Sequence, residues 1–194
     1  MTTTAILLAA DAGEGFTTPK YATPIAGVPM VRAAVDAASL WPVGDVVVVL
    51  GSDAEEVLGV IEDSDVTILI DPDWREGEAA PIRAALDLVT RDRSVDRVVV
   101  ARADQPAVPA DTVDALLTEA ASSDADVVVP KYRYARGWPV VIGESMWRHL
   151  LASEGTYDLH AVISMHAAAI AEVWFDRLSP RSYASAESVR RLAP

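Results

Sequence analysis

Glycine, lysine and aspartate residues follow short apolar runs, in positions where they could bind a phosphate group or a metal ion. The first such run ends at Ala10, and the loop after it holds Gly13, Gly15 and Lys20. Glycines let backbone N–H groups approach an anion closely, and a lysine adds a mobile positive charge. The loop is neither a Walker loop nor a full dinucleotide fingerprint, because Thr18 stands where the third glycine would be. The pattern leaves open a phosphate cradle and a simple turn.

Two later apolar runs end in carboxylates. Asp104 follows the run 97–102, where a carboxylate commonly binds Mg²⁺ that bridges to phosphates. The alternative is an aspartate that only caps a helix or satisfies its loop. Asp71 and Asp73 have the Asp-x-Asp spacing of the metal pair in nucleotide-sugar glycosyltransferases, which keeps a glycosyltransferase-like enzyme as one hypothesis. Two loop acids beside a proline are more often a turn.

Composition limits the classes of protein to which the chain can belong. Its 194 residues are 51% hydrophobic and 23% charged, which predicts a single globular domain over residues 1–194. A formal charge of −13 argues against a nucleic-acid partner, since phosphates would be repelled over most of the surface. No apolar run reaches the ~20 residues of a membrane helix. The absence of cysteine excludes disulfides and fits a cytoplasmic protein.

The elements that must position these residues alternate along the chain. Short β-branched runs predict strands at 6–10, 45–50, 66–70, 97–102, 126–130, 139–142 and 172–175. Apolar stripes at helical spacing predict helices over 28–38, 82–89 and 113–120, with Pro29 in a first turn and Asp111 as an N-cap. We expect an α/β fold with three α/β/α layers and a mainly parallel mixed sheet. Ligands bind such sheets at the carboxyl ends of the strands, where the three loops would converge.

The spacing of these loops resembles the MobA-like NTP transferase family, the molybdenum-cofactor guanylyl- and cytidylyltransferases. The family signature Leu-Ala-Ala-Gly-x-Ser-x-Arg-Met-Gly-x-x-Lys is matched without a gap by residues 8–20. Residues 25–30, 47–51, 71–77, 99–106 and 136–140 are similar to later family motifs in the same order. The resemblance therefore covers nearly the whole chain and implies a Rossmann-like nucleotidyltransferase fold.

The resemblance also implies an activity and a set of site residues. A nucleoside monophosphate would pass from an NTP, with GTP or CTP expected, to a phosphorylated small-molecule acceptor with the help of Mg²⁺. Lys20 and Asp104 are the implied catalytic residues, and Asp104 is the implied metal ligand. The implied nucleotide-binding residues are Leu8, Ala9, Ala10, Gly13, Gly15, Lys20 and Asp71.

The chain departs from the family pattern at positions that would meet phosphate or metal. Asp11 stands in place of the first signature glycine, Gly15 in place of the arginine, and Ala184 in place of a second metal carboxylate. A carboxylate ~5 Å from a phosphate charge costs roughly 3 kcal/mol at an effective dielectric of 20. The lost arginine removes a contact worth roughly 1.5–3 kcal/mol. Two hypotheses follow: a divergent enzyme in which Asp11 or Asp158 replaces the lost ligand, or a catalytically degenerate relative that binds a ligand or a protein partner.

Overall fold

The β-branched runs form the strands of one sheet, and the computed structural model describes residues 2–92, 94–152 and 159–191 of the chain. The strands are β1 (Thr2–Ala9), β4 (Asp45–Leu50), β5 (Thr67–Ile70), β6 (Val95–Arg102), β7 (Val127–Tyr132), β8 (Ala135–Arg136), β9 (Val140–Gly143) and β10 (Ile170–Phe175). Their order is β10-β7-β9-β6-β1-β4-β5, and β8 pairs with β7 beside this path. A separate small ribbon joins β2 (Pro24–Ile25) to β3 (Val28–Pro29).

The sheet is mixed and mainly parallel, which confirms the predicted class. β1 lies parallel to both β4 and β6, β4 to β5, and β7 to β10. Only β9 and β8 run against their neighbours. Continuous apolar runs suit such strands because both faces of a parallel sheet are covered by helices.

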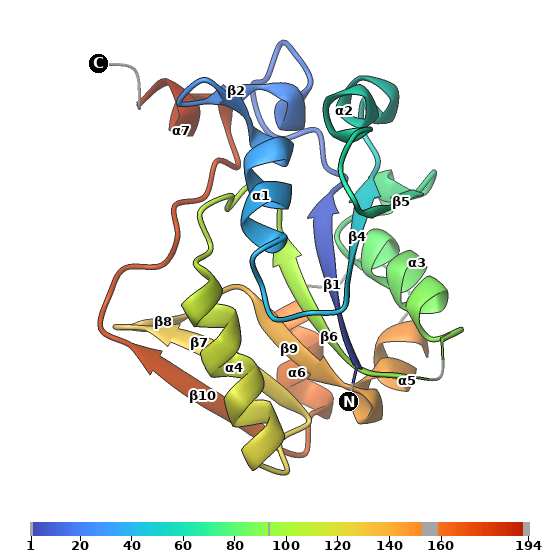
Figure 1. Ribbon diagram of the computed structural model, residues 1–194, viewed down its shortest axis with the longest axis vertical. Coiled ribbons are helices and arrows are strands. Elements are labelled where there is room, and N and C mark those ends of the chain that lie inside the picture. The colour runs from blue at the N-terminus through green and yellow to red at the C-terminus, as the bar shows by residue number, and fades with distance from the viewer. Residues whose placement is uncertain (1, 93, 153–158, 192–194) are drawn as a thin grey trace.

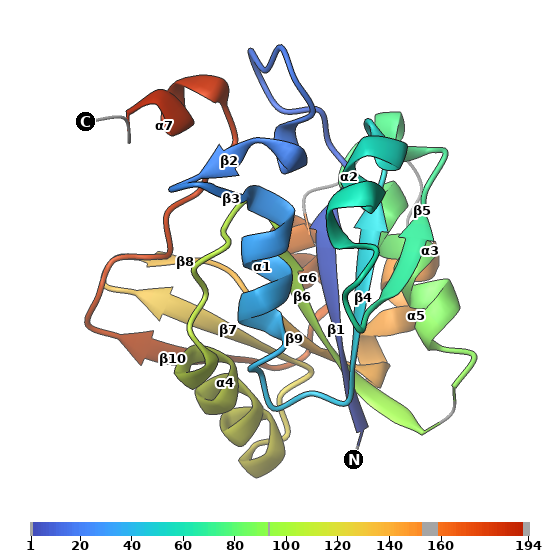
Figure 2. The ribbon, with the colours of Figure 1, turned by 45° about the horizontal axis from the view of Figure 1, so that its top comes forward.

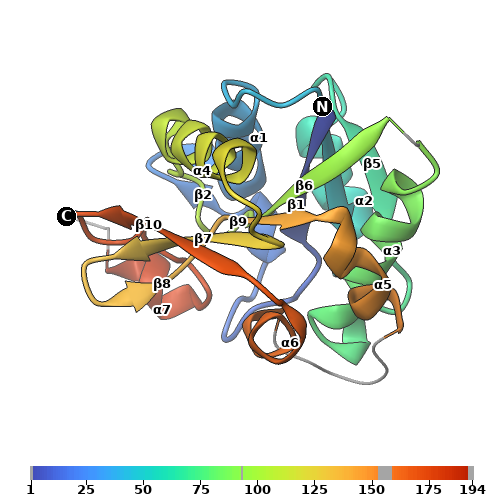
Figure 3. The same cartoon turned by 90° about the horizontal axis from the view of Figure 1, so that it is seen from below.

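Helices cover the two faces in separate layers (Figures 1 and 3). The helices are α1 (Met30–Ala38), α2 (Ala54–Ile61), α3 (Ala79–Val89), α4 (Ala110–Ser122), α5 (Glu144–Ala152), α6 (Leu159–His166) and α7 (Ala186–Arg190). One core holds Leu7 of β1 with side chains of α1, α2 and α4, and the other holds Ile6 with side chains of α3, α5 and α6. Successive residues of a strand point to opposite faces, so β1 contributes to both cores. None of the helices in the described part of the chain could cross a membrane.

Two local predictions about helix starts were wrong. Pro29 belongs to the β2–β3 ribbon and precedes α1, so Val28 lies on the surface instead of in the helical stripe. Asp111 lies inside the first turn of α4, whose N-cap position is Pro109. In both cases a proline with extended backbone ends the preceding segment, and the helix starts directly after it.

The carboxyl ends of β1, β4, β5 and β6 lie at one edge of the sheet, and the loops that follow them gather there (Figure 2). The loop after β1 includes a 3-10 turn, η1 (Lys20–Ala22), and the loop after β5 includes a second, η2 (Trp74–Glu76). The segment before α7 returns to the same edge, where the Ala186 N–H donates to the carbonyl of Glu14. Residues from both ends of the chain therefore meet at this edge.

Candidate functional site

A cavity of about 470 Å³ opens at this edge of the sheet, between the loop after β1 and the start of α3. Its wall is formed by Leu8, Ala10, Asp11, Tyr21, Trp74, Arg75, Gly77, Glu78, Pro81 and Arg102. Trp74 packs so closely against Gly51 that a Cβ there would come within 2.6 Å of the indole. The guanidinium of Arg75 lies 4.4 Å from the centre of the Trp74 ring. The volume and the mixture of apolar and charged walls suit a small organic anion.

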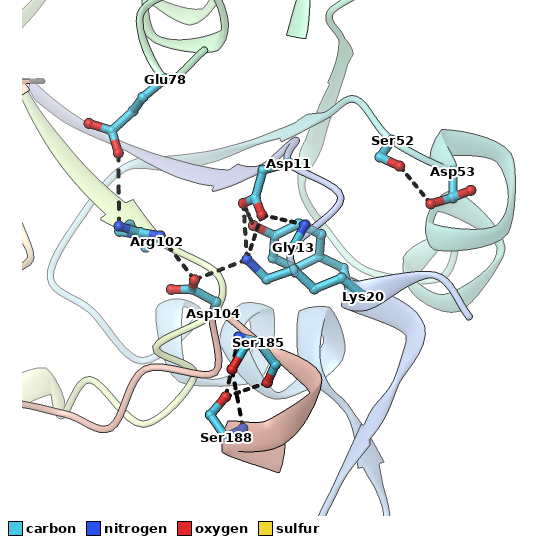
Figure 4. A network of polar contacts seen from close by, with 11 residues as sticks. Asp11, Gly13, Lys20, Ser52, Asp53, Glu78, Arg102, Asp104, Ser185 and Ser188 are labelled. Carbon is cyan, nitrogen blue, oxygen red and sulfur yellow. Dashed lines mark hydrogen bonds and ion pairs between the residues drawn. The ribbon is translucent and has the colours of Figure 1, made fainter. Parts of the chain in front are cut away.

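A network of five charged side chains joins the cavity wall, through Asp11, Glu78 and Arg102, to the buried Lys20 and Asp104 (Figure 4). The Lys20 Nζ donates to Asp11 Oδ1 at 2.7 Å and to Asp104 Oδ2 at 3.0 Å. Arg102 also donates to Asp104 Oδ2 at 3.0 Å, and its other nitrogen lies 3.9 Å from Glu78 Oε2. Two cations thus alternate with three carboxylates. Lys20 and Asp104, whose side chains are 1% and 0% exposed, are stable as ions only because each has an opposite charge beside it.

Asp11 lies at the half-exposed end of this charged network. Its side chain is 53% exposed, whereas that of Lys20 is 1% exposed. The carboxylate also accepts the Gly13 N–H at 2.8 Å and the Tyr21 hydroxyl at 2.5 Å. Burial alone would raise the pKa of Asp11, but the Lys20 charge and these hydrogen bonds outweigh it and hold the pKa below its ordinary value. Burial, and then the negative charge of Asp11, raises the pKa of Tyr21, which stays a hydrogen-bond donor.

Asp104 is the fully buried centre of the charged network. Its side chain is 0% exposed, and both neighbouring cations bind its Oδ2. Its Oδ1 has no hydrogen-bond partner among the described residues. A buried carboxylate oxygen normally has at least one partner. Asp104 Oδ1 is therefore a buried acceptor that the described residues leave without a donor.

Gly13 fixes the shape of the loop around Lys20. Its φ is +67°, a conformation that residues with a side chain rarely adopt. A Cβ at this position would lie 2.7 Å from both the Cδ of Lys20 and the ring of Phe16. The glycine is therefore required by the close approach of the lysine stem as well as by its backbone angle.

The structure brings together only some of the residues that the sequence suggested. Leu8 and Ala10 line the cavity, but Ala9 is buried in the core and Gly15 is exposed in the loop. Lys20 and Asp104 adjoin each other directly below the cavity and do not form part of its wall.

Asp71 lies outside the cavity wall and has a structural role. Its Oδ1 accepts the N–H of Asp73 at 3.0 Å, which closes a turn. Burial raises the pKa of Asp71, and the Asp73 N–H offsets only part of this effect. No group of three His, Asp or Glu side chains within residues 2–92, 94–152 and 159–191 is arranged to hold a metal ion. Asp71 Oδ2 is buried without a hydrogen-bond partner among the described residues, and an Asp-x-Asp metal pair at 71 and 73 stays a prediction.

The segment that would carry the second metal carboxylate does reach the site, but it supplies only backbone. Tyr183 donates its N–H to the carbonyl of Asp104 at 2.8 Å, and the carbonyl of Ala184 accepts the N–H of Glu14 at 3.3 Å. Asp158, the other residue suggested as a replacement ligand, lies outside the described residues.

Sequence reasoning missed Arg102, Glu78 and Tyr21. Arg102 could have been found from its closeness in sequence, because it ends β6 and Asp104 lies in the turn two residues later. Glu78 stands just before α3, and Tyr21 directly follows Lys20. Neither residue has a motif that marks it, because their roles depend on how separate loops pack.

The family model described as the MobA-like NTP transferase domain matches residues 5–170. The chain belongs to this family. The match includes the loop after β1, the carboxyl ends of β4, β5 and β6, and all five side chains of the charged network. A comparison with curated proteins found no match.

Solved structures show the same fold at low sequence identity. A homologue of Rv0371c from Mycobacterium sp. strain JC1 is 24% identical, with a TM-score of 0.85 over 98% of this chain and 94% of the other. Rv0371c from Mycobacterium tuberculosis, in a structure described as a complex with manganese, is 20% identical, with a TM-score of 0.82 over 99% and 98% of the two chains. The molybdopterin-guanine dinucleotide biosynthesis protein A of Archaeoglobus fulgidus is 18% identical, with a TM-score of 0.74 over 97% and 96%. The Rossmann-like nucleotidyltransferase fold expected from the sequence is thereby confirmed.

Proposed function

We propose that this MobA-like NTP transferase moves a nucleoside monophosphate from GTP or CTP to a phosphorylated small-molecule acceptor. The observation that carries the proposal is the adjoining pair of Lys20 and Asp104, 3.0 Å apart, beneath a cavity of about 470 Å³. In this reaction an acceptor phosphate oxygen forms a bond to the α-phosphorus of the NTP. The bond from that phosphorus to the bridging oxygen breaks, and pyrophosphate leaves with the electron pair.

The side chains available at the cavity suit the binding half of this reaction. The guanidinium of Arg102 lines the cavity and can bind a phosphate through two parallel hydrogen bonds, which offsets the loss of an arginine at position 15. The Gly13 N–H and the Lys20 ammonium can neutralise the phosphates next to it. Trp74 and Pro81 provide apolar walls for the rest of the nucleotide. Positioning and charge neutralisation are the main contributions of a protein to phosphoryl and nucleotidyl transfer.

Asp104 is the residue that fits a divalent ion. Its Oδ1 has no hydrogen-bond partner among the described residues, and Mg²⁺ is commonly held by one or two carboxylates together with substrate phosphates. An ion bound there would neutralise charge on the triphosphate and on the leaving pyrophosphate. The single carboxylate implies that substrate oxygens and water complete the coordination, since Ala184 offers no side-chain ligand.

Calorimetric titration with GTP, CTP and ATP, each with and without Mg²⁺, tests the proposal. We expect one nucleotide to bind at submillimolar concentration with Mg²⁺ and to bind more weakly to Asp104→Asn. The exposed Asp87→Asn is the matched control, because Asp87 pairs with Arg91 on the surface, at the end of α3. Absence of binding by all three nucleotides at millimolar concentration would refute the proposal.

A second candidate is a catalytically degenerate family member that binds a ligand or a protein partner. Two observations favour it: Ala184 reaches the site without a carboxylate, and the Lys20 ammonium is already paired with two acids. Pyrophosphate release with candidate acceptors decides between the two. If the natural chain releases pyrophosphate and Asp104→Ala does not, the degenerate alternative is excluded.

A further inference from the structure

The Asp11 carboxylate is held in the way that a bound phosphate would be held. It accepts one backbone N–H from Gly13, one hydroxyl hydrogen from Tyr21 and two contacts from the Lys20 ammonium, at 2.7 and 3.0 Å. A backbone amide at a left-handed glycine, a lysine and a hydroxyl together form an anion site. In this chain the anion in that site is one of its own side chains.

Asp11 also separates Lys20 from the cavity. Asp11, Tyr21 and Arg102 belong to the cavity wall, whereas Lys20 does not. The lysine side chain is 1% exposed, beneath a carboxylate that is 53% exposed. An anion that enters the cavity therefore meets the negative charge of Asp11 before it can reach the positive charge of Lys20.

Metal binding explains these contacts less well. The groups that contact the Asp11 carboxylate all donate hydrogen bonds to it, and both of its oxygens accept at least one of them. At this edge of the sheet, the buried carboxylate oxygens without a hydrogen-bond partner among the described residues are Asp104 Oδ1 and Asp71 Oδ2.

We propose that Asp11 is a built-in inhibitor of the phosphate site, an internal anion that a phosphate-bearing ligand must displace before it can bind Lys20. The proposal rests on the proposed function, because it takes the cradle to be a phosphate site. A ligand displaces Asp11 when its own anionic group satisfies the Gly13, Lys20 and Tyr21 donors together. The Asp11 side chain then moves toward solvent, to which it is already half exposed.

Binding of inorganic tripolyphosphate to Asp11→Asn and Asp11→Gly, measured by calorimetry in metal-free buffer, tests the proposal. Asp11→Asn keeps the size of the side chain and removes its charge, and Asp11→Gly removes both. We expect roughly tenfold or greater gains in affinity for both variants, because one repulsive unit charge is removed from a partly buried site. Glu14→Gln is the matched control: it removes an equal charge from the same loop, where the exposed Glu14 side chain makes no hydrogen bond or ion pair with the described residues. Its affinity should stay within about twofold of the natural chain.

Labelling of lysine with an amine-reactive reagent gives an independent readout. The chain has two lysines, Lys20 and Lys131, and Lys131 pairs with Glu172 far from the cavity, so it serves as the internal reference. Mass spectrometry should show faster labelling of Lys20 relative to Lys131 in Asp11→Gly than in Glu14→Gln. Melting temperatures of all the variants establish that each one is folded.

The outcomes separate the inference from the proposed function. If the natural chain binds tripolyphosphate and the two Asp11 variants bind no more tightly, the inhibitory role is wrong and the proposed function stands. If neither the natural chain nor any variant binds tripolyphosphate while Lys20 labelling rises in Asp11→Gly, the cradle is not a phosphate site and both proposals are wrong. If neither labelling nor affinity changes, Asp11 does not cover Lys20 and the inference is refuted.

Discussion

Replacement of Asp104 by asparagine should destabilise the fold substantially, even in the absence of any ligand. The side chain is 0% exposed, and its Oδ2 accepts hydrogen bonds from both Lys20 and Arg102 at 3.0 Å. Asparagine has nearly the same shape, so the change removes the charge and leaves little cavity. The Lys20 ammonium, 1% exposed, then keeps only Asp11 as a counter-charge, and Arg102 keeps only the more distant Glu78.

The size of this effect follows from the burial of the charges. Removing one partner of a buried ion pair costs about 3–5 kcal/mol when the other charge is left alone. Here both cations retain a second partner, so we expect a loss of roughly 2–3 kcal/mol in the free energy of unfolding. For a domain of this size that is a decrease of roughly 4–12 °C in melting temperature.

Urea unfolding followed by circular dichroism, in buffer with a chelator, measures this difference without any contribution from bound metal. Asp87→Asn is the control, because Asp87, near the end of α3, and Arg91, just after it, form an exposed pair whose separation should cost well under about 1 kcal/mol. Equal stability of Asp104→Asn and the natural chain would contradict this prediction. It would mean that the two cations are hydrated or otherwise paired, and that the buried network does not form.

Three further predictions concern the same edge of the sheet. Gly13→Ala should lower stability by roughly 1–3 kcal/mol in urea unfolding, because φ is +67° and the new methyl would meet the Lys20 stem at 2.7 Å. Gly59→Ala, in an exposed helical position with no atom within 4 Å, should instead raise stability by roughly 0.5–1 kcal/mol, and the same sign for both variants would contradict this account. The Asp11 ion pair should stabilise the fold fully above the ordinary carboxyl pKa of 3.8 and lose its contribution as pH falls below it, because the folded-state pKa is the lower one. As pH falls below 3.8, the free energy of unfolding should therefore decrease less steeply for Asp11→Asn than for the natural chain. Parallel decreases in the two proteins would count against the ion pair between Asp11 and Lys20. Arg102→Met should weaken tripolyphosphate binding roughly tenfold, since it removes a charge-assisted contact from the cavity wall, and unchanged affinity would place the phosphate elsewhere.

The framework of the fold could be read from the sequence, because strands buried on both faces are apolar throughout. The runs at 45–50 and 97–102 correspond closely to β4 and β6. Helices α2, α5 and α6 were not predicted, because each spans only eight or nine residues and an apolar stripe repeats barely twice over that length. Helices of eight or nine residues depend more on tertiary packing than on their own sequence.

The candidate site was only partly predictable for a related reason. Motif spacing suggested Lys20 and Asp104 as site residues. It did not show that Asp11, from the same loop as Lys20, would cover the lysine. The sequence comparison located Asp11 where a triphosphate would lie and treated it as a repulsive charge. Its pairing with Lys20 depends on the backbone turn at Gly13 and on the hydroxyl of Tyr21, and these are matters of three-dimensional geometry.

The backbone contacts between residues 14 and 184–186 have a consequence for the order of events in folding. The β1–β4–β5 portion of the sheet can form from residues that are close in sequence, but the site edge is closed by a segment from far along the chain. Contacts between distant residues carry the largest loop-closure entropy and form late. During synthesis, the nascent chain can therefore assemble the β1–β4–β5 portion of its sheet before residues 183–186 contact Glu14 and Asp104. The edge that holds the charged network becomes complete only after residue 186 has left the ribosome.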